Sequence, residues 1–385
     1  MGIDAIFNAH NWALVPFHFW SLCFFVLGCM AGSFLNVCIH RMPLGMSIIT
    51  PRSHCPHCRY SIPWYLNIPL VTWLALGGRC KNCGAPISPR YFIVELLTGV
   101  AFLGCWLAFG NSAHPLPSML LALVYAIFLA GLIVATFIDF EHLIIPDEIT
   151  IGGMAVGFGL SFFLPALHGA GSPDVGMRRG FVGAIVGAGT VYAILRLGKW
   201  LFGRQRVKLP ADARIVFGES AVHLPDKDIP YEELFYRQSD VVVLQARTVE
   251  LVDRGYQNVE VRLSPGALEI GEDKFNPDDV PWLEAVSAEV VLPREAMGLG
   301  DVKFMGAIGA FIGWQGVLFT LTVSSLIGAF YGATMVLLRR QEWSGRLYFG
   351  PFIALAAAIW IFAGWPLVMG YQHLTESLMV SLVPH

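Results

Sequence analysis

Long apolar runs separated by short polar segments make up most of the chain. Eight of these runs are candidate membrane spans, at residues 17–39, 92–109, 117–138, 149–167, 181–202, 302–314, 316–338 and 349–369. Seven are long enough to cross a hydrocarbon core of roughly 30 Å as helices, and 302–314 is shorter. The pattern therefore predicts an all-α polytopic membrane protein with about eight transmembrane helices.

A different pattern occupies residues 203–297. Apolar and polar residues alternate at 259–263 and again at 267–270, with Ser-Pro-Gly between them. Alternation on both sides of a short turn predicts a β-hairpin, and the apolar run 241–244 is a further strand candidate. The segment therefore predicts a small β-rich soluble insert.

Together these patterns divide the chain into five predicted parts. They are a first transmembrane span (1–39), a cytoplasmic zinc-binding loop (40–91), transmembrane helices with Asp139 (92–202), the soluble insert (203–297), and a Gly-x-Gly-Asp motif with the C-terminal transmembrane helices (298–385). The first twelve residues contain no Lys or Arg, so we expect the first span to be uncleaved.

Composition agrees with a protein that faces lipid. Hydrophobic residues make up 55% of the chain and charged residues only 14%, and the mean hydropathy is +0.60. Soluble domains usually contain about 25% charged residues. The insert is the exception, because it holds 18 acidic and 11 basic residues, a net charge of −7.

The distribution of basic residues predicts the orientation, because short loops rich in Lys and Arg stay in the cytoplasm. The loop between the first two spans contains no Asp or Glu and six basic residues: Arg41, Arg52, Arg59, Arg79, Lys81 and Arg90. We therefore expect this loop to be cytoplasmic and the N-terminus to be outside. Counting spans from there places Asp139 and Asp301 on the cytoplasmic side, while Arg178 and Arg179 fall in an outer loop as an exception.

Four of the eight cysteines form two Cys-x-x-Cys pairs, Cys55 with Cys58 and Cys80 with Cys83, separated by 21 residues. This spacing is typical of a zinc ribbon, in which two tight turns supply four thiolates to a tetrahedral ion. Disulfides are disfavoured in a reducing cytoplasm. His54 and His57 are alternative ligands nearby, but four thiolates already satisfy the ion. The sequence therefore predicts a structural zinc ion.

Asp139 and Asp301 lie 162 positions apart, each where an apolar run meets a polar segment. A carboxylate at a membrane boundary is costly unless it is hydrated, paired or used. Each alone fits a helix cap or a solvated residue, as we expect for Asp147 before the fourth span. At matching depth, the two instead favour a catalytic pair, in which one ionised carboxylate activates water and one protonated carboxyl polarises a peptide carbonyl. Gly298 and Gly300 would let an extended substrate approach Asp301.

These segments resemble the type IV prepilin leader peptidases, a family of bifunctional Gly-x-Gly-Asp aspartyl proteases. The matching residues are 32–37 with Arg41 and Pro43, the paired cysteines, 67–69 with Trp73, 88–91 with Glu95, 139–147, 298–303 and 349–352. The resemblance implies that Asp139 and Asp301 are the catalytic pair, that Cys55, Cys58, Cys80 and Cys83 bind zinc, and that S-adenosylmethionine is the methyl donor.

The resemblance also implies a setting and partners. These are the bacterial cytoplasmic (inner) membrane with the active site facing the cytoplasm, prepilin and pseudopilin substrates, and membrane lipid, but no nucleic acid. A transporter with a carboxylate relay and a non-catalytic zinc-containing scaffold are the alternative functions. The sequence indicates no oligomeric state.

The sequence assigns no single role to three features, which are the methyl-donor site, Glu95 and the acidic insert. No dinucleotide-type glycine motif is present, so the methyl-donor site is placed loosely on residues 40–90. Glu95 is expected at the start of a helix, where it would favour the helix dipole, with orientation of a substrate amine as the alternative. The acidic insert either attracts a basic leader peptide or is a passive solvated domain.

Overall fold

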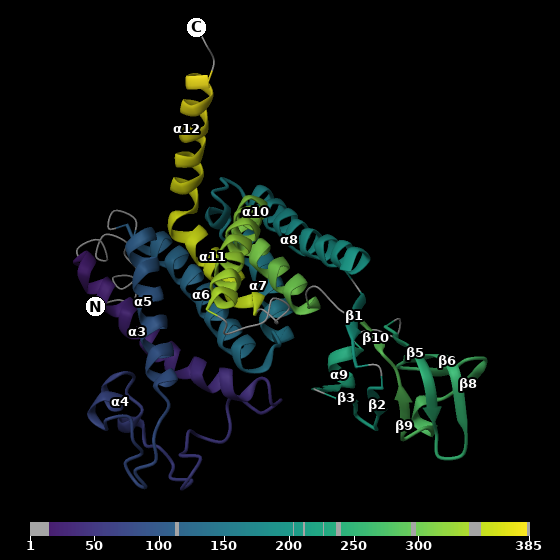
Figure 1. The fold of residues 1–385 in the computed structure, drawn as a ribbon. Coiled ribbons are helices and arrows are strands. Elements are labelled where there is room, and N and C mark those ends of the chain that lie inside the picture. The colour runs from purple at the N-terminus through teal and green to yellow at the C-terminus, as the bar shows by residue number, and fades with distance from the viewer. Residues whose placement is uncertain are drawn as a thin grey trace. The chain divides into compact units, whose positions relative to one another are not determined.

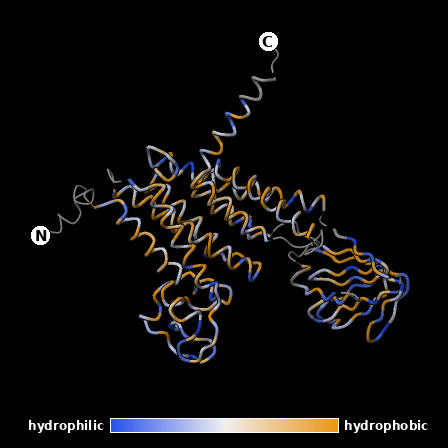
Figure 2. Tube along the Cα trace, turned by 60° about the vertical axis from the view of Figure 1, so that its left-hand side comes forward, coloured by the Kyte–Doolittle hydropathy of each residue, from blue (hydrophilic) through white to orange (hydrophobic). Residues whose placement is uncertain are grey.

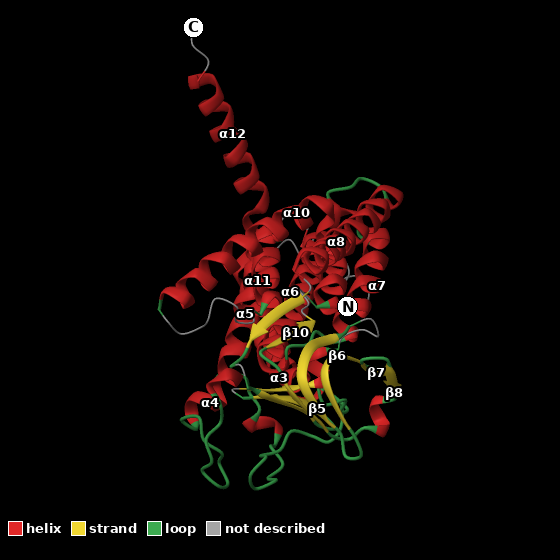
Figure 3. Ribbon diagram, turned by 45° about the vertical axis from the view of Figure 1, so that its right-hand side comes forward, coloured by secondary structure: helices red, strands yellow, loops and turns green. Residues whose placement is uncertain are grey.

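The computed structural model describes residues 15–111, 115–202, 204–210, 212–225, 227–235, 240–293, 298–338 and 348–382. Two compact units make up the chain (Figure 1). The first combines Met1–Val191 with Leu299–His385 and is helical, and the second is Tyr192–Gly298. The second unit contains every described β-strand, drawn in yellow in Figure 3.

The first unit is built from long apolar helices. They are α3 (Phe17–Arg41), α5 (Pro89–Phe109), α6 (Pro115–His142), α7 (Asp147–Phe163), α8 (Pro173–Phe202, which runs into the second unit), α10 (Leu299–Leu337), α11 (Phe349–Ile359) and α12 (Trp365–Leu382). Short helical segments lie at η1 (Trp64–Leu66), α4 (Val71–Ala75), η2 (Pro165–His168) and the π-helix η4 (Trp360–Gly364). Figure 2 shows hydrophobic residues along these helices. Helix α3 packs along α5, and α10 packs against α7 and α11.

Six of these helices are long and apolar enough to cross a membrane: Phe17–Arg41, Pro89–Phe109, Leu116–His142, Pro173–Leu201, Leu299–Leu337 and Phe349–Glu376. The chain is therefore a helical membrane protein, but the predicted count of eight spans is not confirmed. Helix α7 has only 17 residues. The predicted spans 302–314 and 316–338 lie within one element, α10, which is interrupted at Gly313 with φ 71° and ψ 175°.

Glycines bring α8 and α10 into close contact. A Cβ atom added to Gly183 would lie 2.1 Å from the carbonyl oxygen of Gly309, and one added to Gly187 would lie 2.3 Å from that of Met305. Small residues drive helix association in membranes because they let backbones approach closely. These glycines therefore set the spacing between the two helices.

The second unit contains an antiparallel sheet, so the prediction of a β-rich insert is confirmed. Its strands are β1 (Arg204–Lys208), β2 (Arg214–Phe217), β3 (Ala221–Leu224), β4 (Lys227–Pro230), β5 (Val242–Glu250), β6 (Gly255–Ser264), β7 (Ala267–Ile270), β8 (Asp273–Phe275), β9 (Leu283–Val286) and β10 (Glu289–Pro293). The order is β4-β3-β2-β9-β5-β6-β7-β8, and β10 pairs with both β1 and β5. Two short helices, α9 (Tyr231–Leu234) and η3 (Pro277–Asp279), complete the unit.

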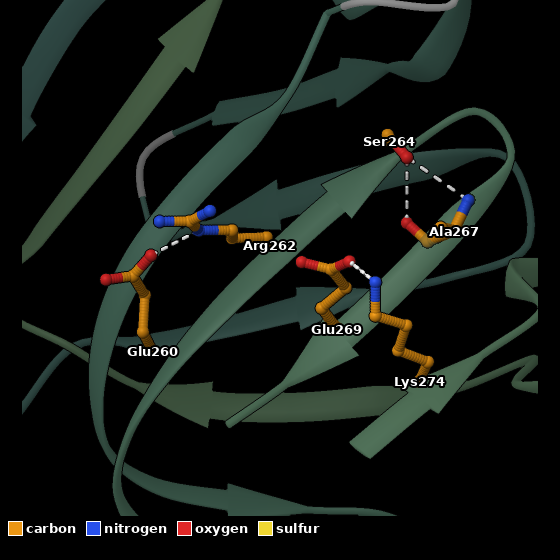
Figure 4. Close-up of polar contacts among 6 residues, drawn as sticks. All are labelled: Glu260, Arg262, Ser264, Ala267, Glu269 and Lys274. Carbon is orange, nitrogen blue, oxygen red and sulfur yellow. Dashed lines mark hydrogen bonds and ion pairs between the residues drawn. The ribbon is translucent and has the colours of Figure 1, made fainter. Parts of the chain in front are cut away.

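The predicted hairpin forms between β6 and β7, with Ser264 opposite Ala267. The Ser264 hydroxyl accepts a hydrogen bond from the Ala267 N–H at 3.1 Å and donates one to the Ala267 carbonyl at 2.9 Å (Figure 4). Lys274 and Glu269 form an exposed ion pair at 2.7 Å on the next strand pair. Such surface pairs add little stability, so the hairpin depends on its turn and its apolar face.

The insert leaves and re-enters the helical chain through adjacent strands. Strands β1 and β10 are antiparallel, with Arg204 opposite Pro293 and Lys208 opposite Glu289. We call this β1–β10 pair the stem of the insert. Its two ends therefore lie side by side although almost 90 residues separate them in sequence.

Candidate active site and metal site

Asp139 lies in the last turn of α6 and is only 7% exposed. The backbone of Gly350, the second residue of α11, hydrogen-bonds its carboxylate. A Cβ atom at position 350 would lie 2.6 Å from Asp139 Oδ2. The first N–H groups of a helix have no partner within the helix and carry partial positive charge. The start of α11 is therefore a polar partner for this buried carboxylate.

Asp301 lies in the first turn of α10 and is half-buried. An acidic residue at this position is stabilised by the helix dipole. Both aspartates are thus associated with helix N-termini, Asp301 within α10 and Asp139 through its contact with α11. The sequence pattern alone did not reveal this shared feature, because α11 begins 210 residues after Asp139.

Ile145 connects the segments that hold the two aspartates. Its Cβ lies 3.7 Å from where a Cβ of Gly300 would be, next to Asp301. Its Cδ1 lies 3.4 Å from where a Cβ of Gly350 would be, next to Asp139. The start of α10, the start of α11 and the segment after α6 therefore meet around one side chain. Joint catalysis by the two aspartates stays a prediction.

Two ion pairs join residues close in sequence to Asp139 and Asp301 to other helices. Lys303 in α10 contacts Asp147 in α7 at 2.7 Å, and Arg90 in α5 pairs with Glu141 in α6. The prediction that Asp147 caps a helix is wrong, because α7 begins at Asp147 itself, after Pro146, and has no side-chain cap. Since Lys303 and Asp147 are substantially exposed, their pair contributes little stability.

The four predicted metal ligands form one cluster. Their sulfur atoms all lie within 4.8 Å of one another, with Cys55 and Cys83 at 3.8 Å and Cys58 and Cys80 at 4.0 Å. Zinc–sulfur bonds of about 2.3 Å in a tetrahedron place sulfur atoms about 3.8 Å apart. The cluster therefore fits a zinc ion, and among the described residues neither His54 nor His57 belongs to it.

The two Cys-x-x-Cys turns have the same backbone pattern. The residue after each turn, Arg59 or Gly84, has φ of 55° or 70° and donates its N–H to the carbonyl of the first cysteine at 2.9 Å. Because L side chains rarely adopt positive φ, Arg59 is a strained position that the turn requires. The repeat of this geometry gives two matching turns, as a zinc ribbon needs.

The Cys58 thiol lies in surroundings that favour its charged form. The Asn82 amide donates a hydrogen bond to Cys58 Sγ at 3.5 Å. This bond, together with a backbone hydrogen bond from Tyr60, lowers the pKa of Cys58 to about 6. Metal ions bind the thiolate and not the thiol, so this environment is suited to a metal ligand.

A cavity of about 480 Å³ lies between α3, α5 and the cysteine loop. Glu95 lines it and is only 8% exposed. The expectation that Glu95 begins a helix is wrong, because α5 starts at Pro89 and has no acidic residue in its first turn. Instead, Glu95 Oε2 accepts a hydrogen bond from the Leu70 N–H at 2.7 Å.

Comparison with known proteins finds two family models along the chain. One, described as the bacterial peptidase A24 N-terminal domain, matches residues 26–109. The other, described as the type IV leader peptidase family, matches residues 126–218 and 281–333. The second match is thus interrupted inside the insert. No solved structure gives a significant match.

Curated relatives are named as prepilin leader peptidases and N-methyltransferases. One from Myxococcus xanthus is 42% identical over 193 residues, which cover 47% of this chain and 56% of the relative. One from Aeromonas hydrophila is 28% identical over 375 residues, covering 91% of this chain and 92% of the relative. A type 4 prepilin-like leader peptide-processing enzyme from Escherichia coli is 41% identical over 148 residues, 34% of this chain and 52% of the relative.

Proposed function

Because the chain belongs to the type IV leader peptidase family, we propose that it cleaves the leader peptides of prepilins and then methylates the new N-terminus. The names of the relatives support both activities. The observation that favours the peptidase activity in this chain is the position of Ile145, whose side chain lies within 4 Å of where a Cβ atom of Gly300 and a Cβ atom of Gly350 would be. Type II secretion pseudopilins are further substrates on this proposal.

In the proposed cleavage, Asp139 and Asp301 act on one water molecule and one peptide bond. The ionised carboxylate takes a proton from water, whose oxygen attacks the carbonyl carbon, while the protonated carboxyl gives its proton to the carbonyl oxygen. As the C–N bond breaks, the proton held by the first aspartate passes to the leaving amine, and the hydroxyl formed from the carbonyl oxygen returns its proton to the second aspartate. The backbone of Gly350 hydrogen-bonds the Asp139 carboxylate, and two carboxyl groups brought close together hold a single proton between them.

The position of this chemistry fits a substrate with a basic leader and an apolar helix. Asp139 ends a candidate span and Asp301 begins one. The loop 40–91 is rich in Lys and Arg and is therefore expected in the cytoplasm. With this orientation, both helix ends face the cytoplasm of a bacterial inner membrane. A leader on that side reaches the aspartates without moving its charges into lipid.

The zinc ion, held by Cys55, Cys58, Cys80 and Cys83, has a structural role in this proposal. Four thiolates complete a tetrahedral site and leave no open position for catalysis. When bound, S-adenosylmethionine would supply the methyl group that the new N-terminal amine takes up.

Replacement of each aspartate tests the peptidase. Asp139→Asn and Asp301→Asn keep the size of the side chain but remove its titration, so each should abolish cleavage of a purified prepilin. The loss of the leader mass is measured by mass spectrometry. Asp279→Asn, on an exposed turn of the insert, is the matched control and should cleave normally. Normal cleavage by either membrane variant would reject the two-aspartate mechanism.

A further inference from the structure

We propose that the cavity between α3, α5 and the cysteine loop binds the methyl donor, with Glu95 as the counter-ion of the donor's positive charge. This inference rests on the proposed methyltransferase function and gives that activity a site. All residues that line the cavity lie between Ser33 and Glu95. They therefore fall within the part of the chain that matches the N-terminal domain model, away from the aspartates.

Glu95 is a buried carboxylate that the protein itself does not neutralise. Within the described part of the chain, it forms no ion pair with a Lys, Arg or His side chain. Its partners are the Leu70 N–H and the Ser33 side chain. A buried charge without an opposite charge is costly, and such residues in membrane helices mark ligand sites. A cationic ligand would supply the missing charge.

The turn whose N–H donates a hydrogen bond to Glu95 has a strained backbone. Leu70 has φ 62° and ψ −53°, and the Val71 N–H bonds to the Pro69 carbonyl at 2.6 Å, which together define a classic γ-turn. This conformation is rare and costs free energy for a residue with a side chain. Here it directs the Leu70 N–H at Glu95. The strained turn therefore holds the carboxylate in one orientation at the wall of the cavity.

A second buried polar group in the cavity wall is incompletely paired. Asn36 is 1% exposed, and its Nδ2 donates to the carbonyls of Tyr91 and Gly32. Its Oδ1 has no hydrogen-bond partner among the described residues. An unpaired buried acceptor costs about 1–3 kcal/mol, so a ligand N–H that reached this oxygen after a small shift of the wall would be stabilising. The amino groups of the donor offer such a hydrogen.

Size and shape also suit this ligand. Small-molecule sites usually enclose about 300–1,000 Å³, and this cavity encloses about 480 Å³. Trp73 supplies an aromatic wall, fixed by its hydrogen bond to the Ile87 carbonyl and by packing against Phe92. An adenine ring stacks well on such a surface.

A neighbouring groove offers a path for the acceptor amine. This groove, of about 1,220 Å³, runs along α3 and shares Ser33, Arg41 and Asn67 with the donor cavity as lining residues. Its other lining residues are mainly apolar, including Phe25, Val26 and Met30. It therefore suits the apolar segment that follows the cleavage point, whose free amine would then approach the shared wall.

Binding measurements on the full-length protein in detergent test the inference without methylation. S-adenosylmethionine carries a positive sulfonium, whereas S-adenosylhomocysteine is a neutral thioether of similar shape. We expect Glu95→Gln to weaken binding of the first by about tenfold or more, with a much smaller effect on the second. Glu272→Gln makes the same chemical change on the exposed surface of the insert and should change neither affinity. Retained leader cleavage shows that Glu95→Gln folds.

Photocrosslinking of the wild-type protein with an azido derivative of S-adenosylmethionine provides a test that needs no variant. Peptide mapping should place the label within residues 33–95. A label confined to other residues, or an unchanged preference for the sulfonium in a folded Glu95→Gln protein, overturns the inference alone. A wild-type protein that cleaves prepilin but neither binds the donor nor methylates the product overturns the proposed methyltransferase function and the inference with it.

Discussion

Gly350 lies against the carboxylate of Asp139, so close that a Cβ atom at position 350 would fall 2.6 Å from Oδ2. Residues 211 positions apart thus form one local structure. Because Gly350 has no side chain, the N-terminal N–H groups of α11 can approach a carboxylate at the end of α6. Absence of a side chain at position 350 is therefore a requirement of the proposed active site.

Gly350→Ala should reduce leader cleavage strongly, because the new methyl group must displace either α11 or the Asp139 carboxylate. A shift of about 1 Å in a catalytic group can lower a rate by about a hundredfold. The cleavage rate is measured with excess purified prepilin. Gly370→Ala in α12 is the control, since a Cβ there meets no atom within 4 Å. Equal rates in the two variants would show that the contact is unimportant.

Cys58→Ser should lower the zinc content of the purified protein well below one ion per chain, because a four-thiolate site loses one ligand. The metal is measured by mass spectrometry of the acid-digested protein. Cys23→Ser, at a partly exposed position of α3, should keep its zinc. A wild-type protein without zinc would refute the metal assignment.

Zinc removal should weaken binding of the methyl donor more than it slows leader cleavage. Cys55 and Cys80 line the donor cavity, whereas the residues around Asp139 and Asp301 belong to other helix ends. Donor affinity and cleavage rate are compared before and after treatment with a chelator, and again after zinc is restored. An equal loss of both, or a loss of cleavage alone, would contradict this separation.

Gly183→Ala should destabilise the helical unit by about 1–3 kcal/mol, the usual cost of overpacking. The added methyl would meet the Gly309 carbonyl at 2.1 Å, so α8 and α10 must separate. Gly189→Ala lies on the same helix and meets no atom within 4 Å. Thermal unfolding in detergent should therefore show a lower Tm for the first variant only. A similar Tm for both would mean that the helices adjust freely.

Deletion of residues 208–292 with a short Gly-Ser linker should leave leader cleavage intact. The two cut points lie close together in the stem, and both aspartates belong to the other unit. A folded but inactive shortened protein would contradict this prediction. Salt dependence then decides the role of the net charge of −7. A wild-type rate that falls with salt and a shortened protein that is insensitive to salt would support attraction of the basic leader.

The sequence predicted the features that depend on local patterns. The cysteine spacing identified Cys55, Cys58, Cys80 and Cys83, and alternation identified the β-hairpin, because both signals lie within short stretches of chain. The count of spans could not be read in this way. The runs 302–314 and 316–338 are separated by a single residue, and they form one element, α10, which is interrupted at Gly313.

Features that depend on remote contacts were out of reach. The surroundings of Gly350 and Ile145 could not be predicted, because they arise only when α6, α10 and α11 pack together. The position of Glu95 in its helix, in contrast, depends on a local signal. Ser-Pro is typical of a helix start, and Ser88 and Pro89 start α5 three residues before the apolar run that begins at Phe92.

The stem also explains how a β-sheet unit can be inserted into a helical membrane protein. Neighbouring strands lie about 4.8 Å apart, so a module joined through β1 and β10 demands almost no separation between the chain ends that receive it. Insertion of such a module therefore need not separate the helices on either side of it in the sequence. A fluorescent reporter with adjacent termini could occupy the same position, which would make this enzyme traceable in living cells without a tag at either end.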